Sequence, residues 1–112
     1  MKVAVIGSRG LEISNLEEYL PEGVTEIISG GARGVDTSAR EYAHAHGIKL
    51  TEFLPEYDKY GRAAPLKRNI TIIEHADLVL AFWDGKSKGT RFVIESCERM
   101  GVEVRVEEML LS

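Results

Sequence analysis

Residues 24–47, VTEIISGGARGVDTSAREYAHAHG, contain a strand pattern, a glycine-bearing loop and a helical pattern in succession. Residues 24–29 have the length and apolar content of a buried strand. Residues 35–46 have apolar side chains at helical spacing, namely Val35, Ala39, Tyr42 and Ala43. Gly47 follows where a helix commonly ends. A strand that leads through a short loop into a helix is the repeating unit of a parallel α/β sheet.

The same pattern recurs along the whole chain. Apolar runs lie at 2–6, 24–29, 48–54, 77–83 and 102–106. Helical patterns lie at 14–20, 35–46, 65–76 and 90–100. The first helix is short, with a capping box from Ser14 to Glu17 and with Pro21 just beyond its end. Right-handed crossovers between parallel strands then predict one Rossmann-like three-layer αβα sandwich over residues 1–112, with a five-stranded parallel sheet in the order 3-2-1-4-5.

Composition narrows the function classes. At 112 residues and 44% apolar content, the chain can bury a core without a disulfide or a metal. Its net charge of −4 disfavours non-specific binding to nucleic acid phosphates. The single Cys97 lies on the apolar stripe of 90–100, which predicts a buried small hydrophobe. No apolar run is long enough for a signal peptide or a membrane span, so we expect a cytoplasmic protein that does not contact the membrane.

Three loops carry glycine at the predicted carboxyl edge of the sheet, where ligands bind in such folds. They are Gly7-Ser8-Arg9-Gly10, Ser29-Gly30-Gly31-Ala32-Arg33-Gly34 and Asp84-Gly85-Lys86-Ser87-Lys88-Gly89-Thr90. Glycine lets backbone N–H groups approach an anion, and a following helix adds its unsatisfied donors. The loops predict a pocket for an anionic small molecule. Neither a Walker A loop nor G-x-G-x-x-G is present, which disfavours ordinary ATPases and NAD dehydrogenases.

Taken in order, four segments resemble the SLOG superfamily, and within it the small YspA-type branch. They are Val5–Arg9, Ser29–Asp36, Tyr60–Ala64 with Arg68-Asn69, and Ala81–Thr90. The resemblance implies a Rossmann-like domain that binds nucleotides or nucleotide-derived ligands. Relatives in the superfamily include DprA, which binds single-stranded DNA, and the LOG phosphoribohydrolases, which release the base from a nucleoside monophosphate.

The resemblance also carries individual residues. Gly30, Gly31, Arg33 and Gly34 match the phosphate-loop segment, and Asp36 matches the acidic residue that opens its helix. Gly89 and Thr90 match the glycine-threonine end of the LOG motif. LOG enzymes carry acidic residues directly after that threonine, whereas Arg91 and Phe92 follow it here and the next acid is Glu95. This departure disfavours hydrolysis.

Further binding candidates come from the residues themselves. They are Gly7, Ser8, Arg9, Arg68, Asn69, Trp83 and Lys88. Cations in the first turn of 65–76 oppose the helix dipole, which indicates that they are placed there for an anion. Trp83 is either a stacking wall or a core residue. Tyrosines in the long connection 55–64 either cover the pocket and stack on a base or pack against the sheet edge.

Some residues keep two interpretations. Asp36 either bonds a ribose hydroxyl or accepts from backbone N–H groups to cap its helix, and Thr90 is an N-cap that is compatible with a phosphate contact. Glu95 is either a surface residue or, with Asp36, a candidate catalytic acid. His44 and His46 do not share a helical face, so we expect no metal site.

Three functions follow. The first is binding or sensing of a phosphorylated nucleotide-type ligand, with no cofactor. The second is hydrolysis of the N-glycosidic bond of a nucleoside monophosphate, and the third is binding of single-stranded DNA, which the net charge disfavours. Family habit also favours a homodimer.

Overall fold

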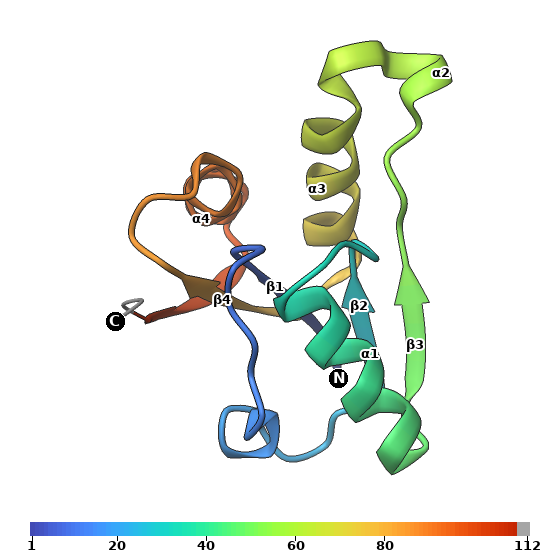
Figure 1. Cartoon of the computed structure of the whole chain (residues 1–112), viewed down its shortest axis with the longest axis vertical. Helices are drawn as coiled ribbons and strands as arrows, with labels where there is room; N and C mark the ends of the chain where they lie inside the picture. The colour runs from blue at the N-terminus through green and yellow to red at the C-terminus, as the bar shows by residue number, and fades with distance from the viewer. Residues whose placement is uncertain (110–112) are drawn as a thin grey trace.

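The centre of the molecule is one sheet of five parallel strands in the order β3-β2-β1-β4-β5 (Figure 1). The computed structural model describes residues 1–109. The strands are β1 (Lys2–Gly7), β2 (Glu26–Ser29), β3 (Lys49–Glu52), β4 (Leu78–Trp83) and β5 (Glu103–Glu108). Both the parallel sheet and its strand order were predicted from the sequence, and both are confirmed.

Helices cover both faces of the sheet, which makes the predicted three-layer sandwich (Figure 1). They are α1 (Val35–His46), α2 (Tyr57–Tyr60), α3 (Ala64–His75) and α4 (Lys88–Met100), with 3-10 turns η1 (Leu16–Glu18) and η2 (Gly61–Ala63). One core lies between the sheet and α1 with η1. The other lies between the sheet and the pair α3 and α4.

Helix α1 has the bounds that its apolar spacing predicts. Val35, Ala39 and Ala43 are fully buried against the sheet, and Gly47 ends the helix in the left-handed conformation at φ 63°. Helices α3 and α4 begin one and two residues earlier than predicted. In both, one end of the expected apolar stripe lies outside the core, because Leu66 is 45% exposed and Met100 is 39% exposed.

The predicted helix at 14–20 is wrong. Only the single 3-10 turn η1 forms there, and Asn15, which precedes it, makes no capping hydrogen bond to its backbone. The Asn15 side chain instead donates to Glu18. Leu11, Ile13 and Leu16 are buried at spacings of two and three, so an irregular chain already places them on the core. A longer helix would turn part of that set away from the sheet.

The tyrosines of the connection 55–64 do not cover the pocket at the carboxyl edge of the sheet, which was one of their two interpretations. The connection forms α2 and η2, which extend beyond the end of α3 (Figure 1). Tyr57 is 58% exposed there. Neither tyrosine of the connection lines the cavity at the carboxyl edge of β1 and β4 that is described below.

Cys97 is fully buried in the core under α4, as its place on the apolar stripe predicted. Burial raises the pKa of its thiol to about 11. No helix within residues 1–109 is both long and apolar enough to span a membrane.

Candidate functional site

A cavity of about 440 Å³ lies at the carboxyl edge of β1 and β4, where the strand order reverses. Its predicted lining residues are Gly7, Ser8, Arg9, Gly30, Asp36, Arg68, Asn69, Gly89 and Thr90. Residues from the ends of three strands and from α3 and α4 therefore meet there. We call this space the inner cavity.

The turn after β1 forms one wall of the inner cavity. Ser8 is 2% exposed, and its Oγ accepts from the backbone N–H of Asp84 at 3.2 Å, which ties the turn to the end of β4. Gly7 is explained by packing, since a Cβ there would lie 2.6 Å from the Val35 side chain. Arg9 follows as an exposed cation at the cavity.

The connection from β4 to α4 forms a second wall. Asp84 Oδ1 accepts from the backbone N–H groups of Lys86 and Ser87, both at 2.8 Å. These two bonds keep the pKa of Asp84 below its ordinary value. Ser87 caps α4 by accepting from the Thr90 N–H, and its Oγ lies 3.2 Å from the Thr90 hydroxyl. The connection thus fixes the start of α4 at the edge of the cavity.

Gly89 lies in the first turn of α4 and lines the inner cavity. A Cβ added at Gly89 would meet no atom within 4 Å. Helical glycine is less stable than alanine by about 1 kcal/mol. Neither the packing nor the backbone of α4 therefore accounts for a glycine at this position.

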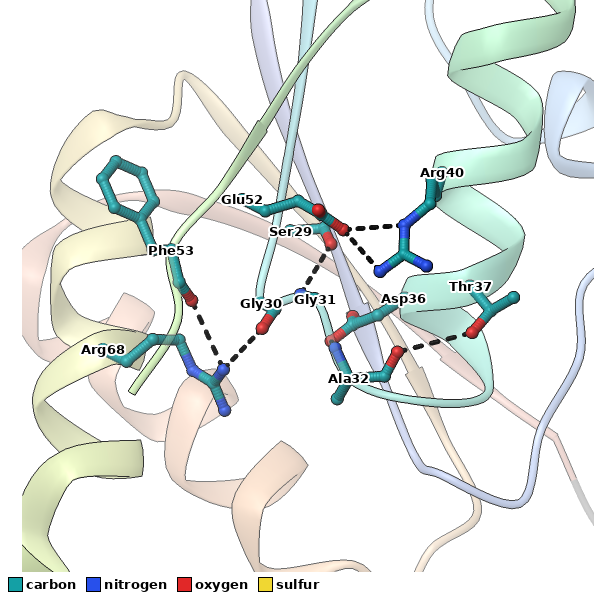
Figure 2. Close-up of polar contacts among 10 residues, drawn as sticks. All are labelled: Ser29, Gly30, Gly31, Ala32, Asp36, Thr37, Arg40, Glu52, Phe53 and Arg68. Carbon is teal, nitrogen blue, oxygen red and sulfur yellow. Dashed lines mark hydrogen bonds and ion pairs between the residues drawn. The ribbon is translucent and has the colours of Figure 1, made fainter. Parts of the chain in front are cut away.

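The loop between β2 and α1 contributes a buried carboxylate (Figure 2). Asp36 is 7% exposed, and its Oδ2 accepts from the Ala32 N–H at 3.0 Å. Burial raises the pKa of Asp36 above its ordinary value, against the opposing effects of the Ala32 N–H and of Arg68. No side-chain nitrogen or oxygen is both buried and unbonded within residues 1–109, so the second oxygen of Asp36, for which no hydrogen bond is found, is accessible to solvent, and Asp36 lines the cavity.

Arg68 reaches from α3 to the ends of β2 and β3 (Figure 2). Its Nη1 donates to the Gly30 carbonyl at 2.8 Å and to the Phe53 carbonyl at 3.4 Å, and its Nε donates to Asn69. Its Nη2 has no hydrogen-bond partner among residues 1–109. Burial lowers the pKa of Arg68, and the facing charge of Asp36 opposes that effect.

Gly30 lets these two charged groups approach the same point of the backbone. A Cβ there would lie 2.7 Å from Arg68 Nη1 and 3.2 Å from Asp36 Oδ2. Yet Asp36 and Arg68 form no ion pair within the described chain. The cavity thus presents an acceptor and a charged donor side by side.

Six predicted residues do not line the inner cavity. They are Gly31, Arg33, Gly34, Trp83, Lys88 and Glu95. Gly34 has φ 73°, and a Cβ there would collide with the Arg9 carbonyl, so backbone packing explains it. The Trp83 indole donates to the Ser87 carbonyl at 3.1 Å instead of forming a wall of the cavity. Glu95 is exposed, which agrees with its interpretation as a surface residue.

The structure adds residues that the sequence did not single out. They are Ile6, Gly10, Ala32, Pro65, Ile72, Asp84, Ser87 and Val93. Gly10, Asp84 and Ser87 belong to the glycine-bearing loops, so the sequence indicated the segments in which they lie. Pro65 and Ile72 lie three residues before and four residues after Arg68, so their helical spacing from Arg68 was the available signal.

Among the described residues, no three histidine, cysteine, aspartate or glutamate side chains gather closely enough to hold a metal ion. The polar groups of the inner cavity are instead suited to hydrogen bonding and to the binding of an anion.

Among known proteins, the chain is similar in sequence to a phage protein. No protein-family model matches it, and no solved structure matches it. The Gene 61 protein of Mycobacterium phage D29 is 33% identical over 84 residues, which cover 70% of this chain and 67% of that protein. On that identity and coverage, the chain belongs to the same family as the Gene 61 protein of Mycobacterium phage D29.

Proposed function

We propose that the protein binds a nucleotide, or a nucleotide-derived phosphorylated molecule, in the inner cavity and releases it unchanged. The observation that carries the proposal is Gly89, which no packing requirement among residues 1–109 explains. The resemblance of the loops to the SLOG superfamily supports the same class of ligand.

The phosphate lies against the start of α4. The first-turn N–H groups of a helix have no partners within the helix and attract anions. Ser87 accepts from the Thr90 N–H, and without a Cβ at Gly89 the phosphate oxygens reach the preceding N–H groups of this turn directly. The Thr90 hydroxyl lies at the same end of the cavity, and Arg9 brings a positive charge from the β1 turn.

The sugar lies toward Asp36 and Arg68. A ribose carries hydroxyl groups, which both donate and accept. The free oxygen of Asp36 accepts from them, and the free Nη2 of Arg68 donates to them. A carboxylate at this position repels phosphate, so it also sets the direction in which the ligand enters.

Binding without turnover is favoured over hydrolysis. Of the two acids that the sequence offered as catalysts, Glu95 lies outside the cavity, and Asp36 holds the β2 loop through Ala32. The second acid that lines the cavity, Asp84, already accepts two backbone hydrogen bonds through Oδ1. We therefore assign no general acid to this site.

The test is native mass spectrometry of freshly purified protein, followed by thermal-shift assays with nucleotides, NAD and ADP-ribose. We expect a ligand that stabilises the fold and is recovered intact. Arg68→Met is expected to abolish the shift, while Arg33→Met, the same change at an exposed arginine outside the cavity, keeps it.

Three results would count against the proposal. Release of free base and ribose phosphate would make the protein a hydrolase, and a thermal shift that Arg68→Met leaves unchanged would place the ligand elsewhere. Absence of any bound or stabilising molecule would contradict ligand binding of this class.

A further inference from the structure

A second cavity of about 310 Å³ lies on the other side of α3, between that helix, α2 and the segment that follows β3. We call it the outer cavity. Its apolar wall is formed by Phe53, Leu54, Tyr60, Ala64 and Ile70. Its volume is within the range of small-molecule sites.

Among residues 1–109, Arg68 is the one residue that lines both cavities. Helix α3 turns Asn69 and Ile72 to the inner cavity, and Lys67 and Thr71 to the outer cavity. The guanidinium group is held at the boundary, because Nη1 donates to carbonyl groups at the ends of both β2 and β3 (Figure 2). Arg68 therefore stands at the boundary between the two cavities.

The chemistry of the outer cavity differs from that of the inner one. Its apolar wall is edged by the hydroxyl of Thr71, the ammonium group of Lys67 and two carboxylates, from Glu56 and Glu74. A flat heteroaromatic ring has the complementary character, with apolar faces and polar edges that donate and accept. The planar guanidinium of Arg68 adds a surface on which such a ring stacks.

We propose that the outer cavity is the site of the base of the nucleotide whose phosphate and sugar occupy the inner cavity. The inference rests on the proposed function and adds the orientation of the bound nucleotide. The ligand runs from Gly89 past Asp36 and Arg68 to the wall formed by Phe53 and Ile70. If the outer cavity binds the base, a sugar phosphate without a base is not the preferred ligand.

The test compares the four ribonucleoside 5′-monophosphates with ribose 5-phosphate by isothermal titration calorimetry. Thr71→Trp fills the outer cavity, and within residues 1–109 the Thr71 hydroxyl makes one hydrogen bond, to the Lys67 carbonyl of its own helix. Leu66→Trp is the matched control, since Leu66 is exposed on the same helix and lines neither cavity. Circular dichroism checks that both variants fold.

We expect at least one nucleotide to bind the wild type about tenfold more tightly than ribose 5-phosphate. Thr71→Trp should remove that difference and leave ribose 5-phosphate affinity unchanged, while Leu66→Trp should keep it. Equal binding of nucleotides and ribose 5-phosphate, or a preference that Thr71→Trp retains, overturns the inference while the proposed function stands. If no nucleotide, ribose 5-phosphate, NAD or ADP-ribose binds, the proposed function fails and the inference fails with it.

Discussion

At the scale of single residues, substitution of Gly89 should affect the stability of the fold and the binding of the ligand in opposite directions. Gly89→Ala should raise the free energy of unfolding by about 0.5–1 kcal/mol, because alanine suits a helix better and the added Cβ meets nothing. The same change should weaken ligand binding, because the Cβ stands between the phosphate and the helix N–H groups. Urea unfolding and calorimetric titration measure the two effects.

Gly101→Ala is the control for that substitution. Gly101 also has open space around its missing Cβ, but it ends α4 at φ 72°. An alanine there is strained by about 1 kcal/mol, so this variant should be less stable and should bind normally. A Gly89→Ala protein that is destabilised, or that binds as well as the wild type, would contradict the assignment of Gly89 to the ligand.

Asp36 gives a second residue-scale prediction, which concerns pH. Because burial raises the pKa of Asp36 above its ordinary 3.8, the native state holds its proton more strongly than the unfolded chain does. This carboxyl therefore subtracts stability as pH rises from about 4 through its native pKa. Asp36→Asn removes the titration and keeps an oxygen that can accept from Ala32, so its stability relative to wild type should increase as pH rises from about 4 through the native pKa of Asp36.

Urea unfolding of both proteins across that pH range measures this difference. Glu95→Gln removes one negative charge from an exposed position outside the cavity and is the matched control. A relative stability of Asp36→Asn that falls with rising pH would show that the charge of Asp36 is stabilised in the native state, with Arg68 or the Ala32 N–H outweighing burial.

At the scale of elements, the connection between β4 and α4 depends on Asp84. Its carboxylate accepts from two backbone N–H groups, which keeps the pKa of Asp84 low. That stabilisation is present above its ordinary pKa of 3.8 and is lost as pH falls through the lower native value. Asp84→Ala should therefore lower both stability and ligand affinity at neutral pH, whereas Lys86→Ala, at an exposed position of the same loop, should change neither.

Chemical denaturation of these two variants, repeated at acidic pH, tests the role of the carboxylate. The deficit of Asp84→Ala should shrink once the wild-type carboxyl is protonated. A deficit that does not depend on pH would mean that the side chain acts through packing and not through its charge.

The elements also show how far the sequence determines the result. Strands β1 and β4 were predictable because consecutive residues in them are buried, which gives each a continuous apolar run. Helix α1 was predictable because its buried residues recur at helical spacing and Gly47 marks its end. The segment 14–20 was not, because its apolar side chains reach the core from an irregular chain and its capping pattern finds no long helix. The burial of Leu11, Ile13 and Leu16 in the core therefore determines the backbone there, and the local capping pattern does not.

The candidate site was predictable wherever the loop itself forms the wall, as at Ser8, Gly30 and Thr90. The candidate site was not predictable where the orientation of a side chain determines whether it lines the cavity. Lys88 and Thr90 are two residues apart in one motif, yet only Thr90 lines the cavity. Asp84 lies in a predicted glycine-bearing loop, but its role could not be predicted, because it accepts from backbone N–H groups and no spacing rule for ligand binding describes that role.

At the scale of the whole molecule, Cys97 reports on global stability because it is fully buried between α4 and the sheet and is the chain's single cysteine. Its thiol pKa of about 11 leaves almost no thiolate at neutral pH, so a thiol reagent should react only after the core opens. The labelling rate should therefore rise with urea in step with unfolding. A ligand at a hundred times its Kd adds about 2.7 kcal/mol of stability, which should slow labelling about a hundredfold. Cys97→Ser gives the unlabelled baseline. Fast labelling without urea, or labelling that a saturating ligand does not slow, would mean that α4 opens locally while the rest of the sheet stays folded.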